Sequence, residues 1–146
     1  MHTVHPASLR SSRLALSLAA LMFTATCGTA NAAAIEATLT GAQEAPPVET
    51  SASGTAKFML KADRALSGSV KTKGVDGTGA HIHEGGPGVN GAALITLKKK
   101  NDHEWTVPVG AKLTADQVNA LKAGTLYVNV HSDAHNGGEI RGQLKH

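Results

Sequence analysis

Apolar residues recur at every second position through most of the chain after residue 33. In residues 35–39, 56–60 and 66–70 they alternate with polar or small residues. This two-residue period is typical of strands that bury one face, whereas an amphipathic helix repeats every three to four residues. Further segments of strand character are separated by Gly, Asn, Asp and Pro clusters: 79–84, 92–98, 104–109, 125–132 and 139–144. About eight short strands in about 110 residues predict an all-β fold, an antiparallel Greek-key sandwich or barrel.

Two segments depart from the strand pattern. Residues 114–123 have helical spacing, begin with a Thr114-x-x-Gln117 capping box and are followed by Gly124. We therefore expect one short helix that connects two strands. Residues 41–54 contain two consecutive prolines, which cannot sustain a central ladder, and predict a loop or an edge segment.

The N-terminal segment has the organisation of an export signal. Arg10 and Arg13 supply positive charge, an apolar stretch follows, and Ala30-Asn31-Ala32 fits a signal peptidase site. We expect a signal peptide at 1–32, a β domain at 33–146 and a periplasmic or secreted protein. The apolar stretch is too short to span a bilayer and no later one is long enough, so no membrane span is expected.

The composition excludes several kinds of function. Cys27 is the only cysteine, so neither an intramolecular disulfide nor a multi-thiolate metal site can form. An alternative to the cleaved signal is a lipoprotein box with Cys27 lipidated, although Thr26 is an unfavourable residue before it. Without Arg10 and Arg13 the charge is nearly balanced, with 12 basic and 11 acidic side chains. With Trp105 as the only tryptophan, the domain lacks a basic stripe and a stacking platform, and nucleic-acid binding is not expected.

Four histidines of the expected mature domain are candidate metal ligands. His81 and His83 stand two apart on a predicted strand, so both rings leave the same face, roughly 7 Å apart at the backbone. His131 closes the predicted strand 126–131 with the same outward parity, and His135 follows in a polar turn. This pattern predicts one metal ion held by three histidines, with His135 as a candidate fourth. The alternative is that these rings only pack and hydrogen-bond on a sheet surface, because sequence alone does not make the two strands neighbours.

Copper is the expected ion, and zinc is the second choice. Imidazoles suit both ions, and among divalent first-row metals the affinity of such sites is highest for copper. An exported compartment is also where copper is handled. Glu84 and Asp133 lie next to candidate ligands in the sequence and could orient an imidazole from behind, or each could be an ordinary turn residue.

Several motifs together resemble the chordin-type (CHRD) domain. They are the run LTGAQEAPPV at 39–48, the H-x-H at 81–83 with the glycine-rich 85–91, YVNVH at 127–131, and GEIRGQL at 138–144. The resemblance covers residues 35–144. It implies an all-β, immunoglobulin-like or barrel fold, and by itself implies little chemistry. A metal-free extracytoplasmic interaction or adhesion module of this family is therefore the alternative to a metal-binding domain.

A fainter similarity to the copper/zinc superoxide dismutases implies a chemistry. Those enzymes carry an H-x-H on one strand, a third copper-ligand histidine at a later strand end, and an arginine near the C-terminus beside the copper. By position these fall on His81, His83, His131 and Arg141. The similarity implies superoxide as substrate, with Arg141 as the catalytic residue that holds the anion. The chain has no disulfide and no clear counterpart of the zinc-holding loop, so a copper-only relative is the most that is implied. Copper storage, or its transfer to a partner protein, is the alternative to catalysis.

Overall fold

The alternating segments form strands of one antiparallel sheet. The computed structural model describes residues 1–3 and 32–146, so the predicted export signal lies almost entirely outside the described residues. The strands are β1 (Ala33–Thr40), β2 (Ser53–Leu60), β3 (Leu66–Lys73), β4 (Gly77–Glu84), β5 (Ala93–Thr96), β6 (Lys98–Asn101), β7 (Glu104–Thr106), β8 (Leu126–Ser132) and β9 (Ile140–Gln143). Within the described ranges, no helix is both long and apolar enough to cross a membrane.

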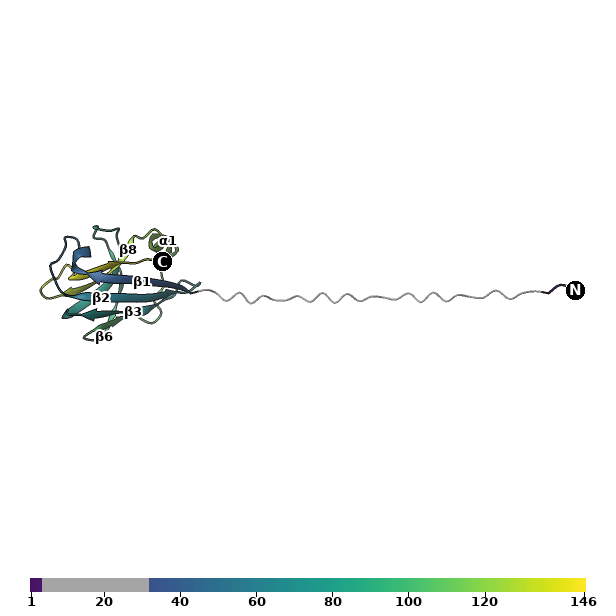
Figure 1. Cartoon of the computed structure of the whole chain (residues 1–146), viewed down its shortest axis with the longest axis horizontal. Helices are drawn as coiled ribbons and strands as arrows, with labels where there is room; N and C mark the ends of the chain where they lie inside the picture. Colours follow the sequence, from purple (N-terminus) through teal and green to yellow (C-terminus); the bar gives the residue numbers. More distant parts are fainter. Residues whose placement is uncertain (4–31) are drawn as a thin grey trace.

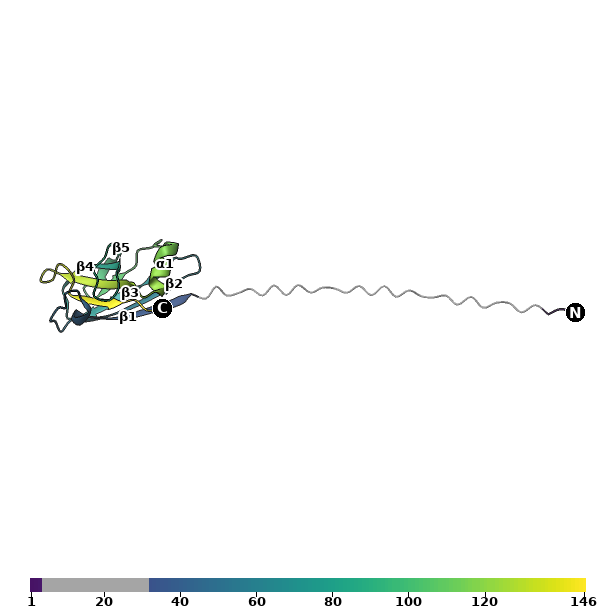
Figure 2. The same cartoon turned by 90° about the horizontal axis from the view of Figure 1, so that it is seen from above.

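The sheet curls into a nearly closed barrel. Its strand order is β5-β4-β8-β9-β1-β2-β3-β7-β6, so β4 and β9 pair with strands distant in sequence. Figure 1 shows β1, β2 and β3 side by side, and Figure 2 shows β4 and β5 on the layer opposite β1. The barrel nearly closes where β6, at one end of the order, approaches β4 near the other end, and Lys99 Nζ donates to Gly77 O at 3.1 Å. The predicted fold class, an all-β antiparallel sandwich or barrel with one short helix, is confirmed.

One predicted strand is two strands in the structure. Residues 92–98 were expected to form a single strand, but the chain changes partner at Leu97. The preceding residues pair with β4 as β5, and the following residues pair with β7 as β6. Leu97 itself is buried, and its amide bonds to β4. The alternation of apolar residues identifies a strand but not its partner, so this turn from one edge of the sheet to the other could not be predicted.

The barrel interior holds the apolar residues that the alternation assigned to the inner faces. Fully buried members include Ile35, Leu39, Phe58, Ile82 and Val128. Each such side chain contributes roughly 1.5–3 kcal/mol of transfer free energy. The opposite positions of β2 are exposed, as a strand with one buried face requires.

The helix forms as predicted. It is α1 (Ala115–Lys122), and its N-terminus has the complete capping box: Gln117 N donates to Thr114 Oγ1 at 3.1 Å, and Thr114 N donates to Gln117 Oε1 at 2.8 Å. Leu121 is the buried residue of this helix. Gly124, just beyond the C-terminal end of the helix, has φ 73°. Residues 41–52 contain the short 3-10 helix η1 (Gly41–Gln43) and otherwise run as a loop, in agreement with the two prolines, but β2 begins at Ser53, so the loop ends two residues earlier than predicted.

Strands β8 and β9 are buried on both faces, which the alternation did not predict. Tyr127, Asn129 and Arg141 point away from the barrel interior, yet each is at most 2% exposed. The loops 85–92 and 41–52 lie over this outer face and contact each other through a hydrogen bond from Asn90 Nδ2 to Ala45 O. The polar residues on the outside of β8 and β9 therefore form a second, polar layer beneath the two loops.

Candidate metal centre

Strands β4 and β8 bring the three predicted ligands together. The strands pair antiparallel, with Gly79 opposite His131 and His81 opposite Asn129. Because side chains alternate along each strand, His81 and His83 leave β4 on the face from which His131 leaves β8. The sheet topology thus makes β4 and β8 neighbours, which the sequence alone could not show.

The three rings form a tight group. Nitrogen atoms of His81, His83 and His131, one from each, all lie within 4.8 Å of one another. His81 Nδ1 and His131 Nε2 share a hydrogen bond of 3.0 Å, which a bound ion would replace. The ring centroid of His81 is 5.6 Å from that of His83 and 4.9 Å from that of His131. All three side chains are half-buried, so the group is open to solvent on one side.

Backbone carbonyls orient two of the rings. His83 Nδ1 lies 3.0 Å from Gly91 O, and His131 Nδ1 lies 2.9 Å from Asn136 O. A carbonyl only accepts, so each Nδ1 carries the proton and each Nε2 keeps a lone pair; that of His131 accepts the hydrogen bond from His81 Nδ1. A metal-ligating histidine commonly donates its other N–H to such a carbonyl, which fixes the tautomer.

Gly91 is needed for this contact. A Cβ at that position would overlap the carbonyl oxygen of Glu84, so only glycine allows the loop to approach β4 this closely. Glu84 N also donates to Ala92 O at 3.1 Å, which fixes the end of the loop. The carbonyl that orients His83 is therefore positioned by backbone packing.

The electrostatics favour neutral imidazoles. Burial lowers the pKa of His83 from its ordinary value, and hydrogen bonding to Gly91 only partly opposes this. Burial also lowers the pKa of His81, and the neighbouring His131 and His83 lower it further. Neutral rings have free lone pairs, which is the form that binds metal ions.

One ring nitrogen has no partner within the described residues. His83 Nε2 is buried and makes no hydrogen bond there. A buried polar atom without a partner is destabilising by about 1–3 kcal/mol, and an ion or an ordered water removes this penalty. This nitrogen belongs to a group of three imidazoles, and such a donor set fits a metal ion that accepts imidazole nitrogen.

His135 and Arg141 do not join the three rings. His135 lies in the turn after β8, where its backbone N–H bonds to Ser132, and it is not part of the group within 4.8 Å. Arg141 is 1% exposed; its Nη2 donates to Gly86 O at 2.8 Å and to Val89 O at 3.1 Å. The arginine thus points outward from β9, as its parity predicts, but it binds the underside of the 85–92 loop.

Tyr127 separates Arg141 from the histidines. The ring of His83 stacks on Tyr127 with a centroid distance of 4.8 Å and an interplanar angle of 4°. Arg141 Cζ lies 3.5 Å from the centroid of Tyr127. Because the strand order is β4-β8-β9, the tyrosine ring lies between the two groups. Gly91 N donates to Tyr127 Oη at 3.2 Å, so this stack also supports the loop.

The sequence did not indicate the residues that orient the site. Glu84 and Asp133 were candidates, but both are exposed, and the ring N–H groups go to the carbonyls of Gly91 and Asn136 instead. Backbone carbonyls carry no sequence signature. Asn129 and Glu44, which lie next to the site, were also missed. For Asn129 a signal was available, since it has the same outward parity as His131.

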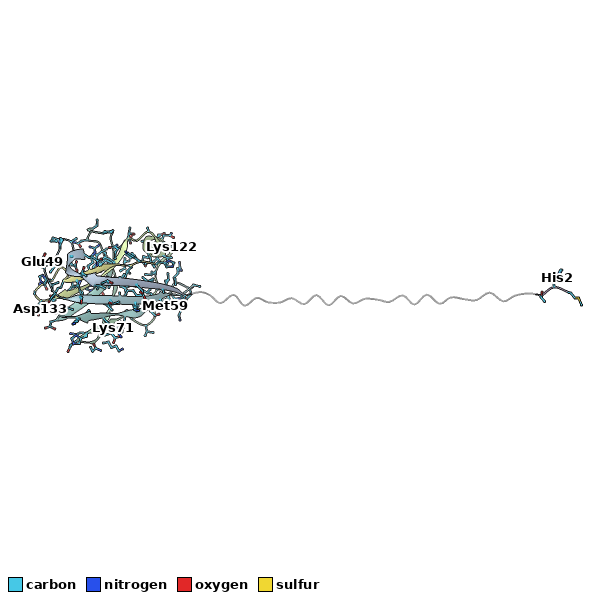
Figure 3. All side chains as sticks on the ribbon, in the orientation of Figure 1. His2, Glu49, Met59, Lys71, Lys122 and Asp133 are labelled. Atoms are coloured by element: carbon cyan, nitrogen blue, oxygen red, sulfur yellow. The ribbon has the colours of Figure 1, made fainter. Side chains whose placement is uncertain are left out.

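Glu44 is a buried carboxyl on this side of the barrel. It is 5% exposed, and its Oε1 has no hydrogen-bond partner in the described part of the chain. Burial raises its pKa from 4.5 to about 7, against the positive charge of Arg141 and hydrogen bonds from Ala45 N and Asn129. By contrast, Glu49 and Asp133, which Figure 3 shows together at one end of the domain, are exposed.

This carboxyl predicts a pH-dependent stability. Between pH 4.5 and about 7 the unfolded chain has lost the proton of Glu44 while the folded chain retains it, so rising pH favours unfolding. Below that range both states hold the proton, and above it both have lost it. The full pKa difference corresponds to about 3 kcal/mol, and partial solvation reduces the expected loss to about 1–2 kcal/mol.

Urea unfolding of wild type and Glu44→Gln at about pH 4.5 and about pH 8 measures this effect. The free energy of unfolding of wild type should fall relative to that of Glu44→Gln as the pH rises. Glu49→Gln, an exposed neighbour, is the control and should follow wild type. A difference between wild type and Glu44→Gln that is the same at both pH values would contradict the prediction.

The fold and the histidine group define a β-barrel domain that carries a candidate metal site on its outer surface. Residues 35–144 match the CHRD domain, so the chain belongs to the CHRD domain family. Domains of this family are extracellular-type modules, in keeping with the export expected from the sequence. Comparisons with curated proteins and with solved structures give no match.

Proposed function

We propose that this CHRD domain is an exported copper-binding protein that holds one ion through His81, His83 and His131. The observation that carries the proposal is the buried Nε2 of His83, which has no partner among the described residues and belongs to a group of three imidazoles with nitrogens within 4.8 Å of one another. If the rings only packed on the sheet, a hydrogen bond to this nitrogen would make the fold more stable. Two of the rings are also oriented by carbonyls in the manner of metal ligands.

Copper is favoured over zinc by its higher affinity for imidazole donors and by the lack of a carboxylate in the group. The three donors are imidazole nitrogens with no thiolate among them, which suits copper and zinc alike. Copper has the higher affinity for such donors among divalent first-row ions. No carboxylate is among the three grouped residues to act as general base for hydrolysis. Zinc therefore remains the second choice.

Storage or transfer of copper is a better fit than superoxide dismutation. A dismutase would need Arg141 to bind the incoming anion, but its guanidinium is 1% exposed and donates to Gly86 and Val89. Tyr127 also lies between it and His83. A copper-loaded protein should thus leave the lifetime of superoxide unchanged. Rapid dismutation by the loaded protein would instead favour catalysis.

Metal uptake tests the proposal against the metal-free interaction module. Purified protein is incubated with excess Cu(II), dialysed against a weak chelator, and analysed for protein and copper. We expect about one copper per chain, because the three rings converge on one position. Protein that retains no copper would favour the interaction or adhesion module.

A further inference from the structure

Asn129 lies beside the three histidines and has an unused oxygen. The side chain leaves β8 between Tyr127 and His131, opposite His81 on β4, and is 2% exposed. Its Oδ1 is buried and has no hydrogen-bond partner among residues 32–146. A buried amide oxygen normally accepts a hydrogen bond, so a vacant one next to a metal site requires an explanation.

The unused oxygen and the unused nitrogen of the site are close together. Asn129 lies two positions after Tyr127, the register partner of His83, so its side chain is the diagonal neighbour of His83 on the same face, and no hydrogen bond joins the two. His83 Nδ1 donates to Gly91 O, so the Nε2 that faces this region is an acceptor, as is Asn129 Oδ1. Two acceptors cannot bond to each other, but an ion between them satisfies both.

Glu44 and Gly138 hold the amide in this orientation. A Cβ at Gly138, which has φ 130°, would lie 2.7 Å from Asn129 Nδ2 and would also clash with Glu44 Oε1. Asn129 and Glu44 therefore meet over a position that only glycine leaves open. The nitrogen end of the amide therefore lies beside the Glu44 carboxyl, and the oxygen is the opposite end of the amide.

We infer that Asn129 Oδ1 is a fourth donor of the metal site and makes it selective for Cu(II) over Cu(I). The inference rests on the proposed copper site. Three imidazoles suit either oxidation state, whereas a carbonyl oxygen is a hard donor that suits the oxidised ion. Loss of such a contact to a bound metal typically lowers affinity by about 10–100-fold. The protein would then retain copper in its oxidised form.

Two variants of Asn129 separate this role from a structural one. Asn129→Leu keeps the volume and removes the oxygen, and Asn129→Asp keeps an oxygen at the same place. Affinities for Cu(II) and for Cu(I) are measured by competition with chelators specific for each ion, with the fold of each variant checked by thermal unfolding. We expect Asn129→Leu to lower Cu(II) affinity about tenfold or more and to leave Cu(I) affinity within about twofold. Asn129→Asp should bind Cu(II) at least as tightly as wild type.

The outcomes distinguish this inference from the proposed function. If wild type binds neither ion, the copper site itself is wrong. If wild type binds copper and Asn129→Leu binds Cu(II) with unchanged affinity, the fourth donor is wrong and the three-histidine site stands. An equal loss of affinity for both oxidation states in Asn129→Leu, or a loss in Asn129→Asp as large as in Asn129→Leu, would show a structural role and overturn the inference.

Discussion

Replacing His131 by Ala should lower the affinity for Cu(II) by about 100-fold or more. His131 contributes the only imidazole from β8, and its Nε2 is hydrogen-bonded to His81 Nδ1 at 3.0 Å. Without it, the two remaining rings come from one strand and leave one side of the ion to water. Its Nδ1 bonds to the carbonyl of the exposed Asn136, so the substitution should change the melting temperature little. Competition with a chromophoric chelator gives the affinity.

His135→Ala is the matched control for this variant. His135 lies four residues further along the chain and outside the three-ring group, so its removal should change the affinity less than about twofold. His103→Ala, at an exposed histidine next to β7, should also behave as wild type. A His131→Ala protein with the affinity of wild type, or an equal loss in His135→Ala, would contradict the assignment of the ligands.

Arg141→Leu should lower the free energy of unfolding by about 3 kcal/mol and the melting temperature by about 10 °C or more. The substitution removes four hydrogen bonds from a buried charged group and leaves the carbonyls of Gly86 and Val89 without their donor. It also removes the guanidinium from the face of Tyr127. Chemical and thermal unfolding measure both quantities.

The same variant should weaken copper binding indirectly. The 85–92 loop carries the carbonyl of Gly91 that orients His83, and Arg141 holds this loop down. We expect Cu(II) affinity to fall about tenfold, as for other residues that orient a ligand. Lys145→Leu, at an exposed residue near the same end of the chain, is the control for loss of one positive charge. If Arg141→Leu is as stable as wild type and loses only superoxide turnover, the arginine is catalytic and the structural role is wrong.

The fold could be predicted from the sequence to the level of strands and their inner faces. Alternation located the strands, and the capping box at Thr114 located α1. The same parity placed His81, His83, His131 and Arg141 on outward faces, which the structure agrees with. Alternation carries no information on which strands pair, so it could not show that β4 lies beside β8, nor that 92–98 divides between two partners.

The polar layer around the site could not be predicted because it depends on what covers the sheet. Asn129 and Arg141 occupy outward positions that an uncovered strand would expose to water, yet loops from distant parts of the chain bury both. The same covering converts Arg141 from an expected anion-binding residue into a support for the loop. Glu44 lies in a segment rich in proline and without strand pattern, so its burial has no local signal.

Electron paramagnetic resonance of a Cu(II) titration tests the central claim most directly, since it reports the number of sites and the nitrogen ligands together. The account predicts a single signal that saturates at about one Cu(II) per chain, carries nitrogen hyperfine structure from imidazole and is lost in His81→Ala. A signal that does not saturate, or one that persists unchanged in His81→Ala, would contradict it.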